Sequence, residues 1–326
     1  MAITMMTLAK RPGEARAPAA EPAPESRDDE ARSSWGLNEG DEVAPGRSVV
    51  RHLGGGERYE AFLAWDDQLL SLVVAKVLRP ALVDDPASRA ALEAEAAVLR
   101  HLSHPVIVRV FDAAPEAERP HLVLEYVDGP RLSTLIRTYE TTLDQTLSLG
   151  IQLAAAAHYM STRDIVHLDI KPQNIIMAGP ARLIDLSLAR RTDQLPAISS
   201  AIGTPKYMAP EQFDPSRFHE LGPATDVWGI GATLYWMLAK RSPFPAPVSD
   251  SAVLEERYPQ LVHEPAPLPD SVPPDLVELV DTMLAREPAE RPSAREVLEA
   301  LEPMMAALPR PRLGRFRVKR KTHRQL

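Results

Sequence analysis

The chain has 326 residues, 44% of them hydrophobic, which is enough to fill the core of one large domain or of two lobes. It has no cysteine, which excludes disulfides and thiolate metal sites. Its formal net charge is −8, although the last 17 residues carry eight Lys or Arg and no acid. No apolar run reaches the roughly 20 residues of a membrane helix and no secretory signal is apparent, so we expect a cytoplasmic protein.

Residues 1–45 are rich in Ala, Pro, Glu and Arg without apolar periodicity, and we expect them to be a disordered leader. Two β-type runs separated by glycines come next, in RSVVRHLGGGERYEAFLAWD, and a third follows in SLVVAKVLR. Helical spacing of apolar residues predicts a helix over about residues 88–102. The strand pattern then returns in VIVRVFDAA and HLVLEYV.

From residue 128 onward the pattern is mainly helical. The helices are expected in TLDQTLSLGIQLAAAAHYMST, ATDVWGIGATLYWMLA, DLVELVDTML and SAREVLEALEPMM. The chain therefore predicts an α+β fold, with a small β-rich lobe over about residues 46–127 and a larger helical lobe over about residues 128–306. The basic tail, residues 307–326, is expected to be a solvated extension, and the alternative is weak contact with anionic lipid or nucleic acid.

An ion pair is predicted between this first helix and the strand before it. Glu95 falls inside the apolar stripe of the helix, which is formed by Ala91, Leu92, Val98, Leu99 and Leu102. Lys76 falls in an apolar row of its strand together with Val74 and Leu78. A charge in such a position is costly unless it meets an opposite charge, so we expect Lys76 and Glu95 to pair.

Motifs along the rest of the chain extend this pattern. They are, in chain order, LGGGERYEAFLA, VVAK, LEYV, HLDIKPQN, DLS, GTPKYMAPE, DVWGIG with Asp226, and EPAERPSA with Arg291. With these motifs the chain resembles a eukaryotic-like bacterial Ser/Thr protein kinase over about residues 46–306. The resemblance implies the two-lobed protein kinase fold, with ATP and Mg²⁺ as cofactors and proteins as substrates.

The resemblance assigns roles to residues of HLDIKPQN and DLS. Asp169 would orient the attacking hydroxyl and accept its proton, and Lys171 would neutralise charge on the moving phosphoryl group. Asn174 and Asp185 would hold Mg²⁺ through oxygen atoms. Residues of the cleft would contact the nucleotide, namely Leu53, Gly54, Gly56, Ala61, Val74, Lys76, Glu95, Leu124, Glu125 and Val127.

Other residues of these motifs have supporting roles in the resemblance. His167 is expected to pack and to hydrogen-bond, and Thr204 is expected to support Asp169. Self-phosphorylation is expected in the activation segment, with Thr192, Ser199 and Ser200 as candidate acceptors; ordinary polar loop residues are the alternative.

Leu168 departs from the family pattern most visibly. Many members have an Arg there that binds a phosphorylated activation segment, and a leucine cannot make that charge-assisted contact. We therefore predict activity that does not require phosphorylation through that contact; the alternative is that Arg190 or Arg191 supplies the cation. In DLS, Leu186 and Ser187 replace the usual Phe and Gly, while the metal ligand before them is retained.

Further departures concern the ATP site. Tyr59 replaces the third glycine of the loop, and it either stiffens the loop and shields the phosphates or is an exposed tip residue. Ala61 and Val74 exchange the Val and Ala that family members usually have above the adenine. This exchange roughly conserves volume, so we predict that the shape of the adenine site is kept.

The function predicted from these residues is ATP- and Mg²⁺-dependent phosphoryl transfer to protein Ser or Thr. One alternative is a nucleotide-binding pseudokinase scaffold, which the departures suggest and the retained polar residues oppose. Another is a small-molecule kinase similar to the aminoglycoside phosphotransferases. Lys171, GTPKYMAPE and Asp226 favour a protein substrate over that alternative.

Overall fold

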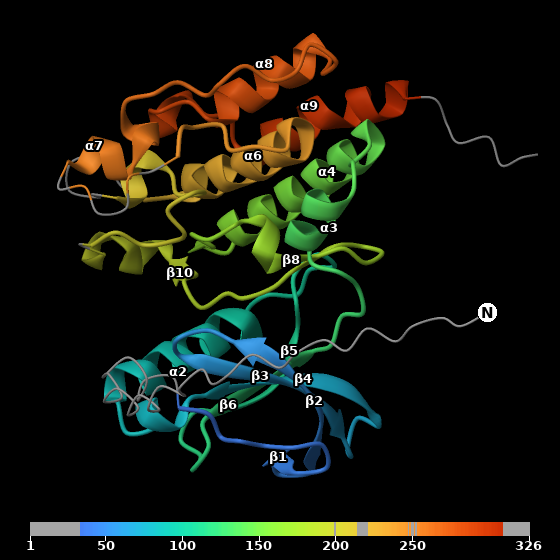
Figure 1. The fold of residues 1–326 in the computed structure, drawn as a ribbon, viewed down its shortest axis with the longest axis vertical. Coiled ribbons are helices and arrows are strands. Elements are labelled where there is room, and N and C mark those ends of the chain that lie inside the picture. The colour runs from blue at the N-terminus through green and yellow to red at the C-terminus, as the bar shows by residue number, and fades with distance from the viewer. Residues whose placement is uncertain are drawn as a thin grey trace, which may run out of the picture.

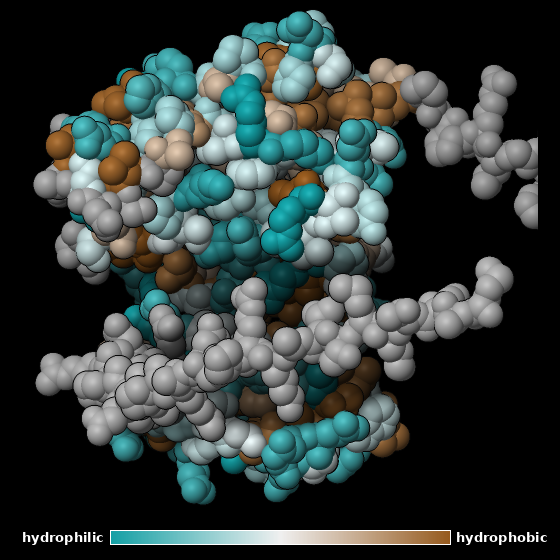
Figure 2. Space-filling view, in the orientation of Figure 1, coloured by the Kyte–Doolittle hydropathy of each residue, from teal (hydrophilic) through white to brown (hydrophobic). Residues whose placement is uncertain are grey.

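The computed structural model describes residues 33–308, except 199, 214–220, 247, 249–250 and 252. These residues form a β-rich small lobe and a helical large lobe, drawn one above the other in Figure 1. On the face shown in Figure 2, hydrophilic residues gather where the large lobe approaches the small one. Within the described part of the chain, no helix has the length and apolar character needed to cross a membrane.

The small lobe is an antiparallel six-stranded sheet with the order β1-β2-β3-β4-β6-β5. Its strands are β1 (Glu42–Ala44), β2 (Arg47–Gly55), β3 (Tyr59–Asp66), β4 (Ser71–Leu78), β5 (Val110–Ala114) and β6 (His121–Glu125). Helix α2 (Pro86–Arg100) begins where the Asp85 carboxylate accepts the N–H groups of Ala87 and Ser88 at 3.3 and 3.0 Å. It packs beside β4, β5 and β6.

The other face of this sheet is covered by residues of the predicted leader. Val73, Ala75 and Val77 alternate onto this face, and Trp35 and Leu37 pack against the cluster that they form. The Trp35 indole N–H also donates to the carbonyl of Leu78 at 2.8 Å. The boundary predicted at residue 45 is thus too late, because single apolar residues that dock on a distant strand leave no local period. Residues 1–32 lie outside the described part.

The large lobe consists mainly of helices. They are α3 (Leu132–Thr138), α4 (Leu143–Ser161), α6 (Pro223–Ala239), α7 (Leu254–Arg257), α8 (Pro274–Met283) and α9 (Ala294–Ala307). Short 3₁₀ turns occupy Pro80–Leu82, Pro172–Asn174, Thr192–Ala197, Pro210–Gln212, Pro259–Leu261 and Pro288–Glu290. Two pairs of short strands lie near the small lobe, β7 (Ile165–Val166) with β10 (Arg190–Arg191) and β8 (Ile175–Ile176) with β9 (Arg182–Leu183).

Helix α6 is the central support of the large lobe. It is buried along most of its length because its sequence is apolar on nearly every side, and it packs against α4 and α8. Gly229 allows it to approach the chain before Lys171 closely, since a Cβ there would lie 2.9 Å from the carbonyl oxygen of Ile170. The fold therefore places the HLDIKPQN segment directly on a rigid helix.

Candidate active site

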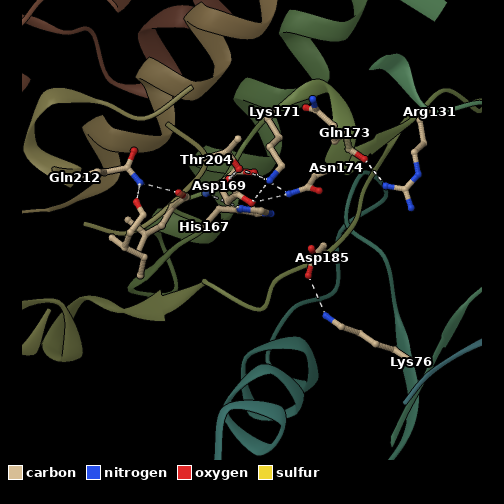
Figure 3. Close-up of polar contacts among 12 residues, drawn as sticks. Lys76, Arg131, His167, Asp169, Lys171, Gln173, Asn174, Asp185, Thr204 and Gln212 are labelled. Carbon is tan, nitrogen blue, oxygen red and sulfur yellow. Dashed lines mark hydrogen bonds and ion pairs between the residues drawn. The ribbon is translucent and has the colours of Figure 1, made fainter. Parts of the chain in front are cut away.

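The predicted ion pair is present at the face of the small lobe that meets the large one. The Lys76 ammonium donates to both carboxylate oxygens of Glu95 at 2.8 Å, which joins β4 to α2. It also donates to Oδ1 of Asp185 at 2.9 Å, as Figure 3 shows. One cation thus holds the strand, the helix and the DLS segment together.

The charges of this cluster fix its protonation states. Burial lowers the pKa of Lys76, but the carboxylates of Glu95 and Asp185 outweigh burial and hold that pKa above its usual value. Burial raises the pKa of Asp185, but the Lys76 ammonium outweighs it and holds that pKa below its usual range. Lys76 and Asp185 are therefore both charged at neutral pH.

A second polar cluster lies on the large lobe. Lys171 donates to Oδ2 of Asp169 at 2.6 Å and also to the hydroxyl of Thr204, which in turn donates to Oδ1 of Asp169 at 2.9 Å. Asn174 donates through Nδ2 to the backbone carbonyl and to Oδ2 of Asp169, at 3.0 and 3.1 Å. Figure 3 shows these side chains converging on Asp169. The support that we expected from Thr204 is a direct hydrogen bond.

Two buried side chains hold the backbone of this loop. The Asp226 carboxylate on α6 accepts the N–H groups of His167 and Leu168 at 2.8 and 2.9 Å. Leu168 has a φ of 66°, a left-handed conformation that is strained for a leucine and that these bonds stabilise. The Gln212 amide donates to the carbonyls of Leu168 and Ile202 at 2.8 and 2.7 Å. Gln212, which directly follows GTPKYMAPE, is not among the residues predicted from the sequence.

His167 lies in the interior, as its predicted packing role requires. Its Nδ1 accepts the N–H of Asp169 at 3.3 Å, and its side chain is fully buried. Burial lowers the pKa of His167, so the ring is neutral at pH 7. His167 is thus a neutral hydrogen-bond acceptor that holds the backbone of Asp169, which is a structural role.

Leu168 takes part in an apolar cluster beneath the activation segment. Besides Leu168, the cluster contains Val166, Leu195 and Leu221, with Leu188, Ile198 and Ile202 packed against it. The candidate cations are occupied elsewhere. The Arg190 guanidinium donates to the carbonyls of Ser187 and Ala189 at 3.0 and 2.8 Å, and Arg191 lies 3.4 Å from the Asp193 carboxylate. Ser199, one of the candidate phosphorylation sites, lies outside the described residues.

Residues assigned to the nucleotide line the underside of the sheet and the connection after it. In the register of β3 and β4, Ala61 lies opposite Lys76 and Leu63 lies opposite Val74, so Ala61 and Val74 are diagonal neighbours on one face. Leu124 continues this row, because it pairs with Val74 from β6. Leu53 and Gly54 lie in β2, and Gly56 directly follows that strand. Glu125 is the last residue of β6, and Val127 lies two residues after it.

The Glu125 carboxylate bridges the two lobes. It lies 3.4 Å from the guanidinium group of Arg109, next to β5, and 3.4 Å from that of Arg182 in β9. Only its backbone is therefore a candidate for contact with the nucleotide. Gly54 has a φ of 108°, which favours glycine and lets the loop turn sharply at the edge of the cleft.

Tyr59 is a half-buried residue and not an exposed tip. The Lys76 ammonium lies 4.6 Å from the centroid of its ring, a cation–π contact, and burial raises the pKa of the Tyr59 hydroxyl. Arg79, which is not among the residues predicted from the sequence, donates to the carbonyl of Gly56 at 2.8 Å. Arg79 thus ties the chain after β2 to the end of β4.

The residues present fit a magnesium site completed by phosphate oxygens. Among the described residues no cluster of three or more His, Asp or Glu side chains forms a metal cage. Mg²⁺ commonly takes only one or two protein ligands and completes its shell with phosphates and water. The Asn174 amide uses its nitrogen toward Asp169, which leaves its oxygen as a ligand, and Asp185 uses one oxygen toward Lys76. The cluster of Lys76, Glu95 and Asp185 has two carboxylates and one ammonium, so a bound cation would balance its charge.

The fold and this pair of clusters have the arrangement of a protein kinase domain, and comparison with known sequences agrees. The family model described as protein kinase domain matches residues 47–301. The chain belongs to the protein kinase domain family.

Three relatives illustrate the similarity. The chain is 31% identical over 248 residues to the serine/threonine-protein kinase PknA of Mycobacterium tuberculosis, a match covering 73% of this chain and 55% of that protein. It is 34% identical over 267 residues to the probable serine/threonine-protein kinase PkwA of Thermomonospora curvata, covering 79% and 34%. A probable serine/threonine-protein kinase of Streptomyces coelicolor is 31% identical over 254 residues, covering 73% and 37%. The matches thus span between about a third and just over half of these relatives.

Proposed function

We propose that the protein is an ATP- and Mg²⁺-dependent Ser/Thr protein kinase that transfers the γ-phosphoryl group of ATP to protein hydroxyls. One observation carries this proposal most strongly. Lys76 binds Glu95 and Asp185 at the same time, while Asp169, Lys171 and Asn174 form one hydrogen-bonded cluster on the facing lobe. This arrangement supports the proposal, because phosphoryl transfer in protein kinases needs the strand lysine paired with the helix glutamate and the metal-binding aspartate nearby.

The large-lobe cluster supplies the groups that act on the substrate hydroxyl. Asp169 would hold that hydroxyl by a hydrogen bond and take its proton as the oxygen attacks phosphorus, a share of the rate that is commonly about 10²- to 10⁴-fold. Lys171 is an ammonium already oriented by Asp169 and Thr204, and it would balance the negative charge that spreads over the phosphoryl oxygens. Thr204 ties this pair to the activation segment.

Nucleotide binding falls to the small lobe and the DLS segment. Lys76 would contact the phosphates while Glu95 keeps its ammonium in place. Asn174 and Asp185 would hold Mg²⁺, which neutralises phosphate charge when bound. Ala61, Val74 and Leu124 would form the apolar ceiling of the adenine site.

Activity without phosphorylation of the activation segment is part of this proposal. A family arginine at position 168 would need a phosphate to balance its charge. Leu168 instead packs against apolar residues of the activation segment, such as Leu195 and Ile202. Apolar contacts of this kind are present without any modification.

Phosphoamino-acid analysis separates an enzyme from a pseudokinase scaffold. The purified protein is incubated with Mg²⁺ and γ-labelled ATP, alone and with a general protein substrate, and label is located after acid hydrolysis. Label on serine and threonine that disappears in Asp169→Ala supports the kinase. A protein that binds nucleotide but never transfers label supports the scaffold.

A further inference from the structure

An open pocket lies beside the catalytic loop on the large lobe. It has a volume of about 590 Å³ and is bounded by α3, by the C-terminal end of α6 and by the segment after Thr204. The proposed roles of the active-site residues leave this pocket without an occupant. Its volume is sufficient for several side chains of an extended peptide.

Two residues that line the pocket are close in sequence to the catalytic cluster. Gln173 lines it and follows Lys171 by two residues, and Lys206 lines it and follows Thr204 by two residues. Tyr207 closes the wall between them, hydrogen-bonded with Gln173, and burial raises the pKa of its hydroxyl to about 12. The pocket therefore lies near enough to Asp169 to be reached by a protein segment whose hydroxyl meets that residue.

Positive charge predominates among the residues that line the pocket. Its cations are Arg137, Lys206 and Lys240, against the single carboxylate of Glu140. The Lys240 ammonium is held by the carbonyl of Tyr139 at 3.1 Å and by Thr141 at 2.9 Å, so it is fixed at the edge of the pocket.

The other two cations are more accessible. Lys206 is exposed, and its ammonium lies 4.7 Å from the centroid of the Trp236 ring. Arg137 is exposed in the last turn of α3, and within the described part of the chain its guanidinium has no ion-pair partner. Just outside the pocket, the Arg131 guanidinium donates to the carbonyl of Gln173 at 2.7 Å (Figure 3).

We propose that this pocket binds an acidic side chain of the protein substrate, close in sequence to the Ser or Thr that receives the phosphate. This inference rests on the proposed function and adds a substrate class to it. A guanidinium and an ammonium that face open solvent bind a carboxylate by charge-assisted hydrogen bonds. A basic side chain in the same place would meet three like charges, so the pocket also disfavours basic substrates.

The test uses two serine peptides that differ only in flanking Glu or Gln residues. For the unmutated protein we expect kcat/KM at least fivefold higher for the Glu peptide, since each exposed ion pair contributes a small factor. The double variant Arg137→Gln/Lys206→Gln keeps side-chain size and should bring this ratio below about two. Arg295→Gln, which removes an exposed cation on α9 that pairs with Glu299, should keep the ratio of the unmutated protein.

Peptide binding measured by fluorescence anisotropy makes the test independent of turnover. Tighter binding of the Glu peptide that is lost in the double variant supports the pocket, even if no peptide is phosphorylated and the proposed function fails. Equal affinity and equal kcat/KM for the two peptides overturn the pocket while leaving the kinase activity in place. A preference for Glu that persists in the double variant also overturns it, because other residues must then cause the preference.

Discussion

The Lys76 ammonium lies 2.8 Å from each carboxylate oxygen of Glu95, and both groups are removed from solvent. The pair spans from β4 to α2, so the position of the helix and the position of the lysine depend on each other. Asp185 adds a third member from the large lobe. The state of this cluster therefore reports whether the two lobes are arranged for catalysis.

Replacing Glu95 by Gln should lower both activity and stability. The change leaves Lys76 with one carboxylate and weakens its link between β4 and α2 to a neutral hydrogen bond, so we expect kcat/KM for ATP to fall at least 10-fold. The free energy of unfolding should fall by about 1–3 kcal/mol, because a buried charge loses part of its compensation. Urea unfolding and a phosphotransfer assay measure the two effects.

Glu93→Gln is the matched control on the same helix. Glu93 is about half exposed and lies 3.6 Å from Arg100, a surface pair. Its loss should change the free energy of unfolding by no more than about 0.5 kcal/mol. Equal effects of the two substitutions would contradict the role given to the buried pair.

Leu168 should make activity independent of phosphorylation of the activation segment. We expect phosphatase treatment to leave kcat within about twofold, because the apolar cluster needs no phosphate. Leu168→Ala should lower the free energy of unfolding by about 2–4 kcal/mol and reduce kcat, as expected for a buried leucine. Leu69→Ala, at an exposed leucine, serves as its control. Collapse of activity after phosphatase treatment would show that a phosphate contact is needed after all.

Val74 and Ala61 should act together on ATP affinity. Val74→Ala removes two methyl carbons from the face that bears Ala61 and should raise the Kd for Mg-ATP by roughly 3- to 10-fold. The double variant Ala61→Val/Val74→Ala restores the lost side-chain volume from the neighbouring strand. It should bring the Kd back to within about twofold of that of the unmutated protein. Titration with a fluorescent ATP analogue measures both. Unchanged binding by the single variant would refute the shared ceiling.

Buried His167 should make the fold sensitive to acid. Its folded-state pKa lies below its usual value because of burial, so protons bind more readily to the unfolded chain. The stability that it contributes is thus complete above about pH 6.5 and is lost as the pH falls below that value. When the pH falls from 7.5 to 5, the free energy of unfolding should fall by up to about 2 kcal/mol less in His167→Gln than in the unmutated protein. An equal fall of the free energy of unfolding in the two proteins would mean that His167 is not a neutral interior group.

The ion pair of Lys76 and Glu95 could be predicted from the sequence because the apolar residues around each follow a regular period, one of a strand and one of a helix. Helical spacing placed Glu95 in an apolar stripe, and strand alternation placed Lys76 in an apolar row. The docking of Trp35 on the sheet could not be predicted in this way, since its partner, the Leu78 carbonyl, is distant in sequence and carries no side-chain signal. The same holds for Gln212, which reaches backbone carbonyls.

Tyr59 shows a different limit. The sequence left two positions for its ring, on the loop tip or over the phosphates, because a single residue in place of a glycine has no period. The structure decides in favour of contact with Lys76, through the pairing of β3 with β4 that places both on one face. The glycine motif thus identifies Tyr59 as a residue of interest, while strand pairing decides where its ring points.

The most direct test of the central claim measures nucleotide binding and phosphoryl transfer on the same Asp169→Ala protein. In the proposed function, Asp169 acts on the substrate hydroxyl and not on the nucleotide, which Lys76 and Asp185 would contact. We predict that the Kd for Mg-ATP stays within about threefold while transfer to protein serine or threonine falls by at least 10²-fold. Transfer that survives this substitution would contradict the account.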